Sequence, residues 1–120
     1  MLVKFDPDDP PLALIRSRAL SYPDATESVI HGRPWFLGPH GFAVYGGATP
    51  GRNKTGHPQS LLVRIEPLDM PARQRDPRFY APAYFASRGW LGIDLDEADW
   101  SEIDELLADS FRIANGTRRI

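Results

Sequence analysis

The densest group of side chains that could bind a ligand lies between Phe79 and Trp90, where the sequence reads FYAPAYFASRGW. Aromatic rings and an arginine can stack on planar ligands, and the guanidinium can pair with a phosphate or carboxylate. With two upstream residues they form a predicted ligand pocket, which comprises His31, Trp35, Tyr80, Tyr84, Arg88 and Trp90. A structural role is the alternative, because alternate aromatic residues of two strands also pack a core.

Charge is distributed unevenly along the chain, although the net charge of its 120 residues is only -2. Residues 94–109 hold eight acidic residues and no basic one, whereas residues 10–93 hold ten basic residues against five acidic ones. A basic body favours nucleic-acid binding, because arginine and lysine pair with phosphates. The predicted nucleic-acid contacts are Arg33, Arg52, Lys54, Arg64, Arg73, Arg75, Arg78 and Arg88. An acidic solvated helix face with scattered surface arginines is the alternative.

Other residue patterns argue against catalysis and metal binding. The chain has no cysteine, which excludes disulfide scaffolds, cysteine-zinc sites and thiol catalysis. Its three histidines lack metal-ligand spacing, and no serine sits in a G-x-S-x-G elbow. The stretch 46–55 fails as a P-loop, because Arg52 and Asn53 stand where Lys and Ser or Thr belong. We therefore predict a non-enzymatic protein without a metal or cofactor.

The elements that must position these side chains follow from apolar spacing and capping residues. Asp9 before two prolines predicts the start of a helix that ends near Tyr22-Pro23. Asp99, Glu102 and apolar residues at three- and four-residue spacing predict a final helix that ends at Asn115-Gly116. Strands are predicted within 28–37, 42–45, 61–65, 79–84 and 90–95, with one or two helical turns in 69–76. Residues 46–60 contain no large apolar side chain and are predicted to be a long loop.

This order of elements predicts a single α+β domain over residues 1–120. About five or six antiparallel strands lie between an N-terminal and a C-terminal helix. No apolar run is long enough to span a membrane, and the N-terminal residues lack the apolar stretch of a signal peptide. We therefore expect a cytoplasmic protein.

Several segments resemble the MmcQ/YjbR family. The spacing of Tyr80, Pro82 and Tyr84 before Arg88-Gly89-Trp90 resembles the C-terminal half of that family, as do the residues of the final helix. His31-Gly32-Arg33-Pro34-Trp35-Phe36 resembles its G-x-P-x-F segment, and Tyr22-Pro23-Asp24-Ala25-Thr26-Glu27 resembles its L-P-G-[VA]-x-E step.

The resemblance implies a curved antiparallel sheet packed by helices, similar to the frataxin-like (CyaY-like) group. Members of the family are often labelled DNA-binding, and the resemblance implies no catalytic residues. Two features depart from the family pattern: the stretch 46–60 is longer than usual, and residues 69–78 have few apolar side chains. Frataxin-like iron binding would rely on acids along an early helix and strand. The first helix here carries Arg16 and Arg18 instead, which argues against iron.

Three functions follow as hypotheses. The leading one is DNA binding through the basic residues. The second is a pocket for a small anionic ligand or peptide, built from the aromatic residues and Arg88. In the third, the acidic final helix docks a basic protein partner.

Overall fold

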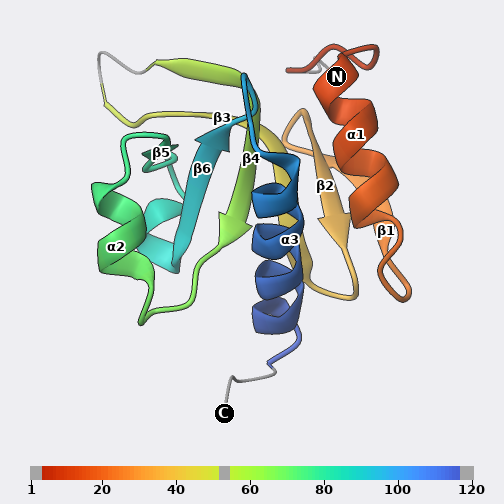
Figure 1. Ribbon diagram of the computed structural model, residues 1–120. Coiled ribbons are helices and arrows are strands. Elements are labelled where there is room, and N and C mark those ends of the chain that lie inside the picture. Colours follow the sequence, from red (N-terminus) through yellow and green to blue (C-terminus); the bar gives the residue numbers. More distant parts are fainter. Residues whose placement is uncertain (1–3, 52–54, 117–120) are drawn as a thin grey trace.

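The computed structural model describes residues 4–51 and 55–116. Along the chain its elements are α1 (Pro10–Ala19), β1 (Thr26–Ile30), β2 (Arg33–Leu37), β3 (Gly41–Ala48), β4 (Gly56–Arg64), α2 (Met70–Arg75), β5 (Phe79–Tyr80), the 3-10 helix η1 (Ala86–Arg88), β6 (Trp90–Asp94) and α3 (Trp100–Ala114). Figure 1 shows their arrangement. No helix within the described ranges is long and apolar enough to cross a bilayer.

The six strands form one curved antiparallel sheet in the order β1-β2-β3-β4-β6-β5. The first four strands follow one another as hairpins, so neighbours in sequence are neighbours in the sheet. β6 then pairs with β4, and the short β5 lies at the outer edge beyond it. This architecture confirms the predicted α+β fold with an N-terminal and a C-terminal helix.

One face of the sheet carries the main core. α1 and α3 lie on this face (Figure 1), where Arg18 of α1 donates to Asp104 of α3. The apolar stripe of α3, formed by Ile103, Leu106 and Leu107, packs against buried residues of the central strands. The spacing of these residues is that of an amphipathic helix, so the sequence pattern and the packing agree.

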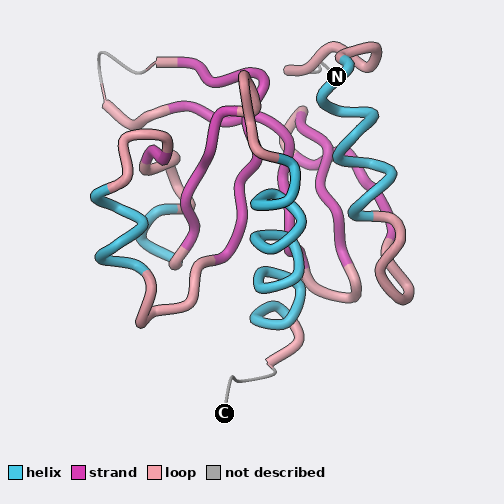
Figure 2. The backbone as a smooth tube through the Cα atoms, in the orientation of Figure 1, coloured by secondary structure: helices cyan, strands magenta, loops and turns pink. Residues whose placement is uncertain are grey.

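The opposite face carries a smaller, aromatic cluster. Val44, Leu62 and Trp90 are buried there, and Trp35, Tyr80 and Phe85 pack against them. Side chains of alternate residues point to opposite faces of a strand, which separates this cluster from the main core. Phe85 comes from the segment between β5 and β6, where it directly precedes the short 3-10 helix η1 (Figure 2).

Two sequence predictions about loops and strands are wrong. The stretch 46–60 is mostly strand, because β3 runs to Ala48 and β4 starts at Gly56, with Gly47 paired to His57. Backbone hydrogen bonds extend this hairpin past the core, so it needs no large apolar side chains. The predicted strand 79–84 ends at Tyr80, since residues 81–88 turn across the sheet instead.

The predicted helix starts are correct in position but differ in their chemistry. The Asp99 carboxylate accepts a hydrogen bond from the Ser101 amide at 3.0 Å, as an N-cap should. Asp9 makes no capping bond to α1. Its carboxylate accepts instead from the Tyr45 hydroxyl at 3.0 Å and from Gln59 at 3.3 Å, which fastens the start of α1 to the sheet.

Candidate functional site

A groove of about 1000 Å³ lies on the aromatic side of the sheet. Its floor includes Trp35 of β2, Val44 of β3 and Leu62 of β4. One wall is the end of β3 and the turn after it, over residues 46–51. The other wall is the segment 82–88, which carries Tyr84, Phe85 and Arg88. An amide of this second wall, that of Ala83, donates to the Ala48 carbonyl at 2.8 Å and so joins the two walls.

The charged side chains of this groove all have the same sign. Lys4, Arg33 and Arg88 line it together with His31, and no aspartate or glutamate does so among the residues that the structure describes. Within the same residues, none of the three basic side chains makes an ion pair or a side-chain hydrogen bond. The groove therefore offers unneutralised positive charge beside apolar surface.

The tight turn between β1 and β2 positions one end of this charge. His31 and Gly32 both have a positive φ there, of 52° and 80°, and the Lys4 amide donates to the Gly32 carbonyl at 2.7 Å. Arg33 follows at the start of β2, and its guanidinium extends over Gly46 of β3. Gly46 has a φ of 85°, a conformation that favours glycine, and a Cβ there would lie 2.6 Å from the Arg33 Nη1 atom.

The segment before β6 positions the other end. Tyr84 has a φ of 71° and is 91% exposed, and η1 then carries Arg88 before Gly89 ends it in the left-handed region. A positive φ costs free energy in residues other than glycine, and such strain concentrates at functional sites. Two of the four such residues in the described chain, His31 and Tyr84, line this groove.

Four of the six residues predicted to form a ligand pocket line the groove: His31, Trp35, Tyr84 and Arg88. The other two are absent from its lining. Trp90 is 3% exposed and contacts the rings of Trp35 and Phe85. Tyr80 stacks on His57 with ring centroids 3.8 Å apart. Tyr80 also shares a 2.7 Å hydrogen bond with Ser60, and burial raises its pKa to about 12.

The groove lining also contains Lys4, Phe85 and the wall of residues 46–51, which were not among the predicted pocket residues. Lys4 joins the groove through a backbone hydrogen bond to Gly32, for which the sequence carries no local signal. The wall did have a signal: residues 46–51 hold no side chain larger than threonine or proline, which leaves room beside a strand.

The residues predicted to bind nucleic acid do not share one environment. Arg33 and Arg88 line the groove and Arg75 is exposed on α2. Arg73 and Arg78 pair instead with Glu102 of α3. Arg64 is half-buried over the Trp90 ring, where burial lowers its pKa, and Arg52 and Lys54 lie outside the described residues. Nucleic-acid binding by this set stays a prediction.

Ion pairs also bring the acidic end of the sequence against the basic body. Besides the two pairs of Glu102, Arg18 of α1 pairs with Asp104 at 2.8 Å. Arg112 pairs with Asp109 within α3 at the same distance. These contacts neutralise part of the charge that is segregated along the sequence. The unpaired basic groups of the groove are therefore the more informative ones.

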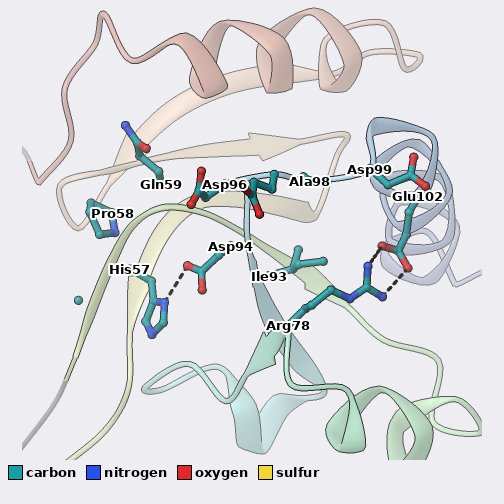
Figure 3. A pocket seen from close by; sticks show the side chains of 12 residues that line it. His57, Pro58, Gln59, Arg78, Ile93, Asp94, Asp96, Ala98, Asp99 and Glu102 are labelled. Carbon is teal, nitrogen blue, oxygen red and sulfur yellow. Dashed lines mark hydrogen bonds and ion pairs between the residues drawn. The ribbon is translucent and has the colours of Figure 1, made fainter.

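A second pocket, of about 680 Å³, has the opposite character (Figure 3). Its lining includes five acidic residues, Asp94, Asp96, Glu97, Asp99 and Glu102. In the figure Arg78 reaches across to Glu102, and His57 Nδ1 lies 2.8 Å from an Asp94 oxygen. No group of three or more potential ligands that could hold a metal ion occurs in the described part of the chain.

The fold and the groove together define a small α+β protein with two helices on one face of an antiparallel sheet and a basic, aromatic groove on the other. The chain belongs to the YjbR family, whose model matches residues 20–113. This match confirms the family that the sequence motifs indicated.

Comparison with solved structures supports the fold alone. A crystal structure of a protein from Pseudomonas syringae has a TM-score of 0.63 and 14% sequence identity to this chain. The likeness covers 85% of this chain and 97% of the other. A comparison with curated proteins found no match.

Proposed function

We propose that the groove binds an anionic ligand, and that the protein acts by binding this ligand rather than by converting it. The charge of the lining carries the proposal: Lys4, Arg33 and Arg88 have no acidic neighbour among the described lining residues, although the chain has a net charge of -2. A cleft lined by one sign of charge concentrates ligands of the opposite sign.

Two arginines outside the groove, Arg16 and Arg78, show the contrast. Arg16 makes two hydrogen bonds to the Glu27 carboxylate, at 2.8 and 2.9 Å, and Arg78 makes two to Glu102, at 2.7 and 3.0 Å. Arg33 and Arg88 have no such carboxylate within the described ranges. An arginine prefers this two-bond geometry with a planar or tetrahedral anion. The ligand would supply the anion that the protein does not.

Unfolding temperatures measured with acetate, pyrophosphate and 2-naphthoate at constant ionic strength test the proposal. A bound anion stabilises the fold by mass action, by about 2.7 kcal/mol at 100 times its dissociation constant. We expect stabilisation of the wild type by at least one of these anions, and its loss when Arg33→Gln and Arg88→Gln are combined. Arg75→Gln is the matched control, because Arg75 is exposed and lies outside the groove lining.

Two results would overturn the proposal. One is that none of the three anions stabilises the wild type. The other is that stabilisation is the same in the groove double variant and in the Arg75 control, because the effect would then come from surface charge in general.

The DNA hypothesis is separated from this one by the same variants. A long polyanion contacts exposed basic residues wherever they lie, so retention on duplex DNA should fall in Arg75→Gln as well as in the groove variants. A ligand of the groove should instead bind Arg75→Gln as tightly as the wild type and bind the groove variants more weakly.

A further inference from the structure

We infer that the ligand of the groove is a planar apolar ring system that carries a carboxylate or a phosphate group. The inference rests on the proposed anion binding and adds the chemistry of the ligand's body. Three observations support it: the aromatic rings of the lining, the walls, and the placement of the two arginines.

The apolar lining of the groove includes two aromatic rings, one on the floor and one on the wall of residues 82–88. Trp35 and Phe85 are half-buried, with ring centroids 5.5 Å apart and planes tilted by 44°. Trp90 lies against both, at 6.1 and 5.3 Å, and is itself buried. This support fixes the two rings that the groove exposes. A ring of the ligand can stack on one of them and meet the other edge to face, the arrangements that aromatic pairs prefer.

The two walls of the groove differ in their side chains. The wall formed by residues 46–51 has no bulky side chain and lines the groove together with Trp35 of the floor. The opposite wall presents Phe85 and the exposed ring of Tyr84. The hydrogen bond from the Ala83 amide to the Ala48 carbonyl, at 2.8 Å, holds the two walls together. A flat body fits between a backbone wall and an aromatic wall better than a bulky one.

The arginines flank this apolar centre. Arg33 starts β2 and Arg88 precedes β6, and because β2 and β6 run antiparallel with β3 and β4 between them, the two residues lie toward opposite ends of the sheet. Three inter-strand spacings of about 4.8 Å separate the strands β2 and β6 by roughly 14 Å. Arginine stems can lie along apolar surface and bring the guanidinium to its rim. An anion held at that rim leaves the rest of the ligand over the rings.

Affinities for four probes test this inference. We expect 2-naphthoate to bind about tenfold or more tightly than acetate, because its ring is removed from water. The uncharged 2-naphthamide should bind about tenfold more weakly than 2-naphthoate, because it lacks the charge-assisted hydrogen bonds. The affinities of 2-naphthyl phosphate and 2-naphthoate then show whether the groove prefers a phosphate or a carboxylate group.

Two groove variants separate the ring from the charge. Phe85→Leu should weaken 2-naphthoate binding about tenfold and leave acetate binding unchanged, whereas Arg88→Gln should weaken both. Tyr84→Ala should also weaken 2-naphthoate binding and leave acetate binding unchanged. Tyr84 is 91% exposed, so the fold of the protein does not depend on this side chain. Arg75→Gln should change none of these affinities.

The outcomes distinguish this inference from the proposal on which it rests. If acetate and 2-naphthoate bind equally, or if Phe85→Leu and Tyr84→Ala leave 2-naphthoate affinity intact, the ring inference is wrong and anion binding stands. If no anion binds, both are wrong.

Discussion

Replacement of Arg64 by alanine should destabilise the fold, because this predicted nucleic-acid contact has a structural role. Its guanidinium lies 4.7 Å from the centroid of the Trp90 ring, and its Nε donates to the Gly41 carbonyl at 2.8 Å. A cation-π contact at a partly buried site contributes about 1 kcal/mol, and a hydrogen bond from a charged donor about 1.5 kcal/mol. We expect the free energy of unfolding to fall by about 2.5 kcal/mol.

Urea unfolding followed by tryptophan fluorescence measures this loss, provided that the denaturant slope is unchanged. Arg64→Lys keeps the charge but loses the planar guanidinium, and should cost about 1 kcal/mol. Arg75→Ala removes an exposed arginine and should cost less than about 0.5 kcal/mol. An Arg64→Ala protein as stable as the Arg75→Ala protein would refute the structural role of Arg64 and leave it as a candidate nucleic-acid contact.

Two further predictions concern stability. Ser110 is fully buried in α3, where its hydroxyl accepts from the Arg64 amide at 2.8 Å and donates to the Phe42 carbonyl, so Ser110→Ala should cost about 2 kcal/mol in urea unfolding. Asp76 is hydrogen-bonded by Arg78, which lowers its pKa to about 2. The contribution of the Asp76 carboxylate to the free energy of unfolding should therefore be complete above pH 4 and be lost as the pH falls toward 2. In Asp76→Asn, the free energy of unfolding should fall less over this pH range.

Both predictions have controls in the same chain. Ser101→Ala changes an exposed serine of the same helix, and should leave the free energy of unfolding within about 0.5 kcal/mol of the wild type. A Ser110→Ala protein as stable as this control would contradict the role of the buried hydroxyl. For Asp76, the stabilities of the wild type and Asp76→Asn should converge in acid, and a constant difference between pH 7 and pH 2 would contradict the assignment.

The sequence predicted the elements whose signals are local. Ile103, Leu106 and Leu107 recur at helical spacing after Asp99, and the structure places them against the sheet as the stripe of α3. The order of helix, strands and helix was enough to predict an antiparallel α+β fold, because short connections join neighbouring strands. The family motifs agree with this fold, and the family match confirms them.

The sequence did not predict features that depend on distant partners. The extension of β3 and β4 beyond the core rests on backbone pairing, which leaves no apolar pattern in Gly56–Gln59. The roles of the arginines divide by partner: Arg78 meets Glu102, 24 residues away, while Arg33 meets no carboxylate in the described part of the chain. Local sequence cannot distinguish a paired arginine from a free one.

Four of the six residues predicted for the ligand pocket line the groove, whereas Trp90 and Tyr80 do not. Trp90 and Tyr80 were expected beside Tyr84 and Arg88 because they are close in sequence. Alternation along the chain turns Trp90 into the buried support of the groove, and the ring of Tyr80 lies against Gly92 and Gly47, where a Cβ would come within 2.4 to 2.5 Å of it.

Backbone amide chemical shifts recorded during a titration with 2-naphthoate test the central claim most directly, because they locate the bound anion. Binding in the groove should move the amide resonances of Gly46, Gly47 and Phe85 together, with one dissociation constant, and leave those of the acidic pocket at Asp96 and Glu97 in place. Shifts that concentrate at the acidic pocket, or that scatter over the surface without saturating, would contradict the assignment of this groove as the anion-binding site of the protein.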